Sequence, residues 1–370
     1  MSVIDALTKK DLLWSDTWPA VRRPAARRPL IVGDRVLIVQ RREATAQEKD
    51  TTGHHAGRLR CLSVTDGAPL WELEDHRLAL DPCRVGGLTW WTGYFGDLVR
   101  VDDDGEIVDE QQVVEDSWHV MPAEGFAVVR AIPGESFVGR IDTTTLATDW
   151  MVAPVAMETI TTSLLIDDAV VLGGHGIPYD EDESDDDESE DDEIEFEDPW
   201  GARLACHAVD SGDLRWVTTR PGYPVALWTA PRGLLVCTRE TWSLLDTATG
   251  EVIIEKPAPA LVQGSGTSRA DDLLLPLAEE KGLAAVDPET LEIRWHAELA
   301  GAMSDHLVVD DQVLVLTEKG VLHALLGADG TEQWRLSLGA GLKGGSGALQ
   351  VDHDHLVIAQ GRGVACYRIR

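Results

Sequence analysis

Short apolar stretches separated by turn residues recur along the whole chain. Residues 304–338 show the pattern clearly, because their apolar stretches are interrupted by Asp-Asp, Lys-Gly and Gly-Ala-Asp-Gly. The stretches have no helical period of 3.6 residues, and their length is typical of strands in an antiparallel meander. We therefore expect strands at 306–309, 312–317 and 321–325, followed by a fourth strand that passes through Trp334.

The last part of this unit, an Asp, a turn and a few residues that close on Trp, returns at regular distances. The segments, or their aligned counterparts, are Asp66 to Trp71, Asp103 to Val108, Asp142 to Trp150, Asp210 to Trp216, Asp246 to Ile254, Asp287 to Trp295 and Asp329 to Trp334. They lie about 40 residues apart, except for one interval that is about 25 residues longer, and this period is typical of four-stranded propeller blades. Asp can bond the backbone of its turn, Gly supplies a positive φ, and we expect Trp to fill the gap between neighbouring blades.

The two ends of the chain suggest one further blade. Residues 361–370 predict a strand that no Trp follows, whereas residues 9–18 offer a closing strand with Trp14 in the tryptophan position. A last blade built from both ends would close the ring and remove its open edges. We predict an all-β fold in which residues 1–370 form a single β-propeller of eight four-stranded blades, with seven as the alternative. The tryptophans expected to hold the blades are Trp14, Trp71, Trp150, Trp216, Trp295 and Trp334.

The repeated segments resemble a known family. "DSGDLRW", "DPETLEIRW", "TDGAPLW" and "ADGTEQW" resemble the Asp-x-x-Thr-Gly-x-x-x-Trp signature of pyrroloquinoline-quinone-like (PQQ-like) propeller repeats. The family includes quinoprotein alcohol dehydrogenases and a non-enzymatic propeller lipoprotein of the outer-membrane β-barrel assembly machinery. The resemblance implies the propeller and leaves the function open, because the motif builds blades in both kinds of protein.

The family's enzymes and its lipoprotein both have features that this sequence lacks. The dehydrogenases are typically longer and carry adjacent cysteines beside the quinone together with Ca²⁺ ligands, whereas no two of the five cysteines here are adjacent. No GxSxG, P-loop or HExxH motif is present either. We therefore expect no cofactor and no enzyme activity of the quinoprotein kind. The lipoprotein's role needs a secretion signal and a lipid anchor, and we find neither in the sequence.

The net charge of the chain argues against some classes of binding partner and favours others. The net charge is −33, from 32 basic and 65 acidic residues, and 15 of the acidic residues lie in the tract 180–198. Such a surface repels nucleic acids and anionic membranes, so we expect protein partners, and a basic partner fits best.

Other features of the sequence indicate where the protein works. No run of 18 apolar residues predicts a membrane span, and the first residues have no apolar core of a signal peptide. The five cysteines are odd in number and widely scattered, which is not the pattern of a disulfide framework. We expect a cytoplasmic protein that is monomeric on its own.

Two insertions interrupt the repeats, at 41–57 and at 173–200, each between the second and third strands of its blade. Those connections share one face of a propeller with the blade-to-blade connections, so we expect both on the same face. The acidic insertion should be disordered by self-repulsion. It is a solvating loop, an arm for a basic partner, or a collector of divalent cations. Three apolar residues at its end form a candidate docking motif: Ile194, Phe196 and Trp200.

The histidines suggest two sites. His54, His55 and His175 fall on the expected insertion face and are candidate ligands for a divalent metal such as zinc, with ordinary polar loop residues as the alternative. His119 and His306 fall near innermost strands and are candidate residues of a site in the central channel.

One segment is cationic. Residues 21–29 carry four arginines in a Pro-rich connection between blades: Arg22, Arg23, Arg27 and Arg28. They would dock an acidic partner, pair with the tract 180–198, or serve as ordinary surface charge.

Two hypotheses for function follow. The first is a non-catalytic scaffold for protein interactions that uses its charged loops. The alternative is an enzyme, or a metal- or small-ligand-binding protein, with its site in the central channel.

Overall fold

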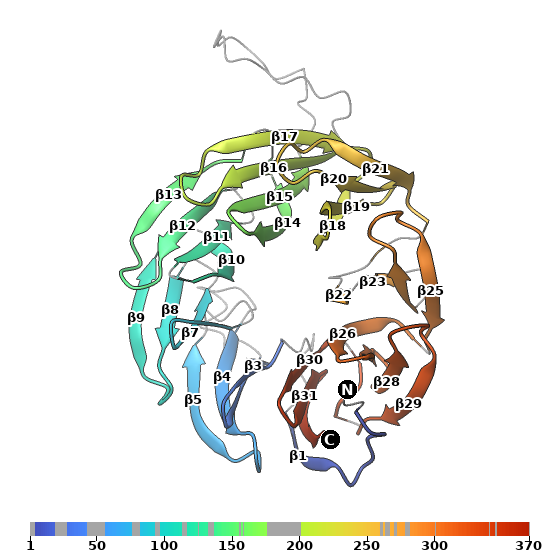
Figure 1. The fold of residues 1–370 in the computed structure, drawn as a ribbon. Coiled ribbons are helices and arrows are strands. Elements are labelled where there is room, and N and C mark those ends of the chain that lie inside the picture. The colour runs from blue at the N-terminus through green and yellow to red at the C-terminus, as the bar shows by residue number, and fades with distance from the viewer. Residues whose placement is uncertain are drawn as a thin grey trace, which may run out of the picture.

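In the computed structural model, antiparallel four-stranded sheets stand around a common axis as the blades of a propeller (Figure 1). The structure describes residues 4–18, 28–42, 56–75, 82–92, 97–112, 117–124, 126–131, 137–154, 157, 159–175, 201–259, 262, 267–269, 272–277, 282–299, 301–339, 341–344 and 346–369. These residues form eight sheets, which confirms the eight-bladed ring.

The first four blades follow the chain from the inside of the ring to its perimeter. Blade 1 is β2 (Leu30–Val32), β3 (Arg35–Arg42), β4 (Ala56–Ser63) and β5 (Pro69–Asp75). Blade 2 is β6 (Cys83–Val85), β7 (Leu88–Thr92), β8 (Asp97–Val101) and β9 (Ile107–Gln112). Blade 3 is β10 (Ser117–Pro122), β11 (Phe126–Ala131), β12 (Val138–Asp142) and β13 (Thr148–Val152). Blade 4 is β14 (Thr159–Ile166), β15 (Ala169–His175), β16 (Ala202–Ala208) and β17 (Leu214–Arg220).

Blades 5 to 7 repeat the same order, and blade 8 departs from it. Blade 5 is β18 (Pro224–Ala230), β19 (Gly233–Thr238), β20 (Thr241–Leu245) and β21 (Val252–Pro257). Blade 6 is β22 (Thr267–Arg269), β23 (Asp272–Leu277), β24 (Gly282–Val286) and β25 (Ile293–Glu298). Blade 7 is β26 (Met303–Val309), β27 (Gln312–Thr317), β28 (Val321–Leu326) and β29 (Glu332–Ser337). Blade 8 is β30 (Gly347–Asp352), β31 (His355–Gln360), β32 (Gly363–Arg368) and β1 (Leu12–Thr17).

The N-terminal segment closes the ring, as the sequence predicts. β1 pairs antiparallel with β32, so the outermost strand of blade 8 comes from the opposite end of the chain (Figure 1). Before β1, Ile4 and Leu7 are buried among apolar residues of blades 7 and 8. The Ile4 carbonyl accepts a hydrogen bond from Trp334 Nε1 at 3.2 Å. Residues 4–11 therefore take the place of the turn that joins the third and fourth strands in the other blades.

Every outermost strand pairs with its neighbour through a β-bulge. The register shifts at the same place in all eight blades, one residue before the tryptophan position. The bulged residues are Leu13, Leu70, Val108, Asp149, Arg215, Ile253, Arg294 and Gln333. A bulge raises the local twist and disrupts the free edge of a strand, so the repeated bulge protects the perimeter against edge-to-edge pairing.

Tryptophan side chains join neighbouring blades. Each tryptophan of an outermost strand donates its Nε1–H to a carbonyl in the turn before the outermost strand of the next blade. The pairs are Trp14 with Val64, Trp71 with Asp103, Trp150 with Val209, Trp216 with Thr247 and Trp295 with Gly327, at 2.7–3.1 Å. The indole also lies against a positive-φ glycine of the same turn: Gly67, Gly105, Gly212, Gly250 and Gly330. The tryptophans therefore fill the gap between blades, as the sequence predicts.

The alignment of blade 2 needs a correction. The register shift and the positive φ of Gly105 place Asp109, and not Val108, at the tryptophan position of that blade. Val108 is the bulged residue and is exposed. The turn of blade 2 is one residue shorter than that of blade 5, because the Gly105 N–H bonds the Asp102 carbonyl three residues back. Because the turn is shorter, an alignment that starts from the turn aspartate places Val108 instead of Asp109 at the tryptophan position.

Candidate functional site

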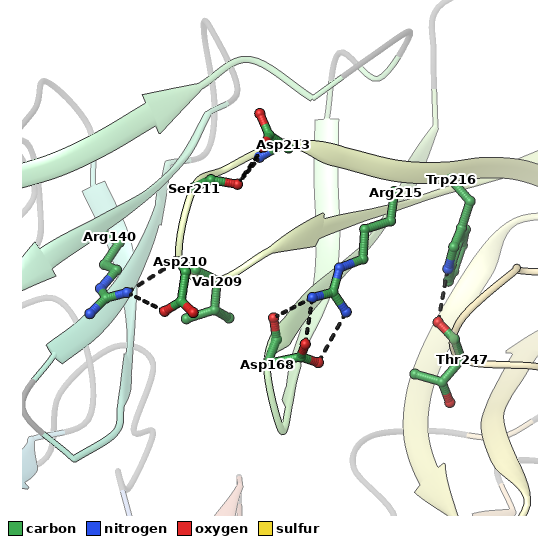
Figure 2. A network of polar contacts seen from close by, with 9 residues as sticks. All are labelled: Arg140, Asp168, Val209, Asp210, Ser211, Asp213, Arg215, Trp216 and Thr247. Carbon is green, nitrogen blue, oxygen red and sulfur yellow. Dashed lines mark hydrogen bonds and ion pairs between the residues drawn. The ribbon is translucent and has the colours of Figure 1, made fainter.

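Polar contacts hold the turns of blade 4 in place, some from the neighbouring blade and some from within blade 4 (Figure 2). Arg140 of β12 reaches blade 4, where it contacts the Asp210 carboxylate at 2.8 Å and the Val209 carbonyl at 3.4 Å. Arg215 of β17 holds Asp168, in the turn between β14 and β15, with its shortest contact at 2.6 Å. These arginines fix the turns, and they add to the tryptophan contacts along the same face of the ring.

Arg100 replaces the missing tryptophan between blades 2 and 3. Its Nη1 donates to the carbonyls of Thr143 and Thr144, at 3.1 and 3.3 Å, and Thr143 is the residue that corresponds to the tryptophan acceptors of other turns. Asp109, at the tryptophan position, holds Nη2 of the same guanidinium at 2.6 Å. Arg100 also lies over the ring of Trp90, 5.6 Å from its centroid. A buried guanidinium held by a carboxylate thus takes over the donor role of the indole.

A leucine occupies the positive-φ position wherever the preceding blade lacks the tryptophan. These leucines are Leu146 in blade 3 and Leu291 in blade 6, with φ of 59° and 56°. Leu291 belongs to the same apolar cluster as Ile254, which stands at the tryptophan position of blade 5. At the junction of blades 5 and 6, leucine and isoleucine thus take the positions that glycine and tryptophan hold at the regular junctions.

The turns at this end of the blades form an acidic face. Acidic residues occupy many of the described turns between first and second strands and between third and fourth strands, and we call this end of the ring the turn face. The residues are Asp34, Asp66, Asp102, Asp103, Asp104, Glu106, Asp142, Asp167, Asp168, Asp210, Asp213, Asp246, Glu251, Asp287, Glu289, Glu292, Asp310, Asp311, Asp329 and Asp354.

Hydrogen bonds keep the turn carboxylates ionised. The Arg294 guanidinium and the turn N–H groups of Thr290 and Glu289 lower the pKa of Asp287 to about 2. The pKa of Asp142 is lowered by hydrogen bonds from Thr145 and Thr144, and that of Asp329 by bonds from Thr331. Hydrogen bonds to the charged form favour it, so the turn face keeps its negative charge in moderately acidic solution.

On the inner strands, one carboxylate ties three blades together. Asp305 of β26 accepts a hydrogen bond from the Leu349 N–H of β30 at 2.8 Å. Its other oxygen pairs with Arg28 at 2.9 Å, just before β2 of blade 1. Arg28 is one of the four arginines that the sequence singled out as partner-binding candidates, and in the structure its guanidinium contacts blade 7. Arg22, Arg23 and Arg27 lie outside the described residues.

His306, a channel candidate, is buried against the neighbouring blade. Its ring hydrogen-bonds the backbone of Leu274 in β23, the second strand of blade 6. Burial and then the charge of Arg28 lower the pKa of His306 to about 4, against the opposing effect of that hydrogen bond. His306 is therefore neutral at pH 7. The structure brings Asp305 and Arg28 together near His306, a grouping that the sequence did not predict.

The structure describes only some of the other candidate residues. His119 lies in β10, the innermost strand of blade 3, and its side chain is outside the described part of the chain. His175 ends β15, with its ring 4.9 Å from that of Tyr223. The remaining candidates lie outside the described residues: His54, His55, Ile194, Phe196 and Trp200. Among the residues that are described, no three His, Cys, Asp or Glu side chains gather in a group that could hold a metal ion.

The cysteines are free thiols within the blades. Cys61, Cys206, Cys237 and Cys366 are buried, and Cys83 is partly buried. Burial raises the pKa of Cys61, Cys83 and Cys206 to about 11 and that of Cys366 to about 12. A thiol reacts as its thiolate, so these residues are poor nucleophiles in the folded protein.

Comparison with known proteins identifies the repeat. Residues 202–370 match the model of a family described as the outer membrane protein assembly factor BamB. This match covers the outer half of blade 4, blades 5 to 7, and β30, β31 and β32 of blade 8. The chain is a PQQ-like repeat β-propeller.

Solved structures extend the likeness of the PQQ-like propeller to nearly its whole length. BamB from Moraxella catarrhalis has a TM-score of 0.62 at 13% identity, over 99% of this chain and 100% of that one. Quinohemoprotein alcohol dehydrogenase from Comamonas testosteroni has a TM-score of 0.69 at 12% identity, over 97% of this chain and 76% of that one. The computationally designed Ika8 protein has a TM-score of 0.69 at 11% identity, over 94% and 97% of the two chains. At such identities the likeness shows the fold alone.

No curated protein sequence matches the PQQ-like propeller significantly. Within the described residues, no helix has the length and apolar character needed to span a membrane.

The sequence carries a signal for the Arg100 junction that is visible only when residues are counted from the turn glycine. Asp109 stands four residues after Gly105, the spacing that separates glycine from tryptophan in the other turns of the PQQ-like propeller. Counting from the glycine would have placed a carboxylate at a tryptophan position and pointed to a cationic partner. The Arg28–Asp305 pair had no such signal, because its residues are 277 positions apart.

Proposed function

We propose that this PQQ-like propeller is a non-catalytic scaffold of the cytoplasm that binds a basic protein partner. The observation that carries the proposal is the turn face, where rigid turns hold many carboxylates in fixed positions and the pKa values of Asp142, Asp287 and Asp329 are lowered. A positively charged partner surface would be attracted to it and oriented by it.

Two other features support the proposal. The tract 180–198, in the connection between β15 and β16, adds 15 acidic residues to the sequence. The five free cysteines are what a reducing compartment would leave, which supports the cytoplasmic location. Arg215 and Arg294 are already paired with carboxylates of the protein itself, Asp168 and Asp287, so they do not mask the other carboxylates of the face.

The test is native mass spectrometry of the protein purified gently from its own cells, combined with elemental analysis. We expect a bound basic protein that dissociates as the salt concentration rises, since exposed charge pairs are screened. A stoichiometric metal or small ligand on a monomer without a protein partner would overturn the proposal and favour the alternative of a channel site.

Two variants locate the surface that binds. The first removes three exposed turn-face charges whose side chains make no hydrogen bond or ion pair with a described residue, by Asp104→Asn, Glu251→Gln and Glu289→Gln. The matched control removes three exposed charges at the opposite end of the blades, by Glu240→Gln, Glu298→Gln and Glu318→Gln. Loss of the partner in the first variant alone supports the turn face. If the first variant still binds the partner, and neutralising the acidic residues of 180–198 abolishes binding, the acidic tract is the binding site.

A further inference from the structure

Three side chains from separate connections of blades 4 and 5 form one cluster. His175 ends β15, Tyr223 lies between β17 and β18, and Arg239 lies in the turn between β19 and β20. The rings of His175 and Tyr223 are 4.9 Å apart and tilted by 41°. The Arg239 guanidinium lies over the ring of Tyr223, with Cζ 5.5 Å from the ring centroid. We call His175, Tyr223 and Arg239 the aromatic–arginine patch.

The patch lies on the end of the blades opposite the turn face. Connections between second and third strands share this end with the blade-to-blade connections, and the three residues come from such connections. Tyr223 is 37% exposed, and Arg239 is also exposed. The patch is thus available to a partner that approaches this end.

Backbone contacts hold the patch in place. The Arg239 N–H donates to the Tyr223 carbonyl at 3.1 Å, which ties the two connections together. The Thr238 hydroxyl accepts hydrogen bonds from the N–H groups of Glu240 and Thr241, at 3.1 and 2.9 Å. Gly222 supplies a φ of 78° just before Tyr223. The tyrosine and the guanidinium are therefore presented by a rigid loop, which lowers the entropic cost of binding.

The guanidinium of Arg239 differs from those at the blade junctions. Arg100, Arg140 and Arg215 each hold a carboxylate of the protein within 3.1 Å. In the part of the chain that the structure describes, Arg239 pairs with no carboxylate, although the protein has 65 acidic residues. A guanidinium stacked on an aromatic ring still presents its N–H edge, which fits the two oxygens of a carboxylate.

We propose that the aromatic–arginine patch binds a carboxylate of an acidic peptide segment on a protein partner. Arg239 donates the paired hydrogen bonds, and Tyr223 fixes the plane of the guanidinium. This goes beyond the proposed function, because the patch selects the opposite charge from the turn face. The two sites can fail separately.

The test measures fluorescence anisotropy of a fluorescein-labelled hexaglutamate peptide with the full chain at physiological salt, and a hexalysine peptide is measured in parallel. We expect Arg239→Ala to weaken hexaglutamate binding about tenfold or more. The control is Arg232→Ala, which removes an exposed arginine from the turn between β18 and β19, on the turn face of the same blade. Tyr223→Leu should weaken binding, and Tyr223→Phe should keep it. Thermal unfolding confirms that each variant is folded.

A second measurement identifies what occupies the patch. In the Arg239→Lys variant, a carbodiimide can join the amine at position 239 to a carboxylate that contacts it. A cross-link to the peptide supports the proposal. A cross-link to residues 180–198 of the same chain overturns it, because the chain itself would then cover the patch. Absence of hexaglutamate binding, or equal losses in the Arg239 and Arg232 variants, also overturns it. If a partner is still bound in native mass spectrometry after such a result, the scaffold function stands without the patch.

Discussion

The indole of Trp150 lies on Gly212 of the next blade, and its Nε1 donates to the Val209 carbonyl of the same turn at 2.7 Å. The glycine serves two purposes there. It has a φ of 77°, which other residues adopt at a cost, and it leaves room for the ring. The relationship recurs around the propeller and gives a sharp test of how the blades are held.

Gly212→Ala should destabilise the protein by about 2–4 kcal/mol, because the added Cβ would lie 2.8 Å from the Trp150 ring and the backbone is left-handed. Gly33→Ala is the control, since Gly33 has a φ of 59° and no atom within 4 Å of the added Cβ. It should cost about 1 kcal/mol. Urea unfolding of both variants gives the two free energies. Equal losses would show that backbone strain alone matters and that the indole contact does not.

Arg100→Met should cost about 2–3 kcal/mol, because it leaves Asp109 without its ion pair and the Thr143 carbonyl without its donor. Arg335→Met is the control, since Arg335 is exposed and, among the described residues, pairs only with Glu332, at 3.9 Å. Its free energy of unfolding should change by less than about 0.5 kcal/mol. If Arg100→Met proved as mild as the control, the guanidinium would not be the substitute for tryptophan that we infer.

Trp14→Ala should loosen the eighth blade first. Trp14 is buried in the cluster that joins β1 to blade 1, and removing such a side chain costs about 3–5 kcal/mol. Hydrogen exchange should then be fastest in β1 and in β32, its partner strand. Leu12→Ala, at a partly exposed position of the same strand, should leave the exchange pattern nearly unchanged. Uniform acceleration across all blades would contradict the idea that closure is a local event.

His306 makes the stability depend on pH. Its pKa is about 4 in the folded protein and about 6.5 when unfolded, so the unfolded state binds more protons between these values. Stability should therefore fall as the pH drops from 6.5 towards 4, by about 3 kcal/mol from this group. Unfolding free energies of the wild type and of His306→Gln, measured across that range, should converge at low pH. Parallel curves would show that His306 titrates normally when folded. Asp287 loses its contribution only below its unfolded pKa of about 3.8, outside this window.

The blades could be predicted from the sequence because the information is local. Alternating residues, turn glycines and Trp334 lie within a few residues of each other, and the second and third strands of blade 7 were predicted nearly to their ends. The eighth blade could be predicted from Trp14, because a tryptophan at this position marks an outermost strand at the start of the chain as it does elsewhere. In blade 2 the turn is shorter and Asp109 replaces tryptophan, so the same reasoning selected Val108.

The candidate sites were harder to predict because they depend on distances between blades. Alternation shows which side of β26 carries His306, and it does not show that blade 6 buries the ring against Leu274. The patch of His175, Tyr223 and Arg239 joins three connections whose only common feature in sequence is their place in the repeat. Such groupings appear only after the ring is built.

The noncovalent closure of blade 8 has a consequence for synthesis on the ribosome. β1 leaves the ribosome long before β32 does, and β32 is the strand that it pairs with. Until then β1 has no strand to pair with, and Ile4 and Leu7 lack the residues of blades 7 and 8 that bury them, although the blades between them can already form. The ring is therefore completed after translation of its other parts, and the nascent chain carries an unpaired strand through nearly all of its synthesis.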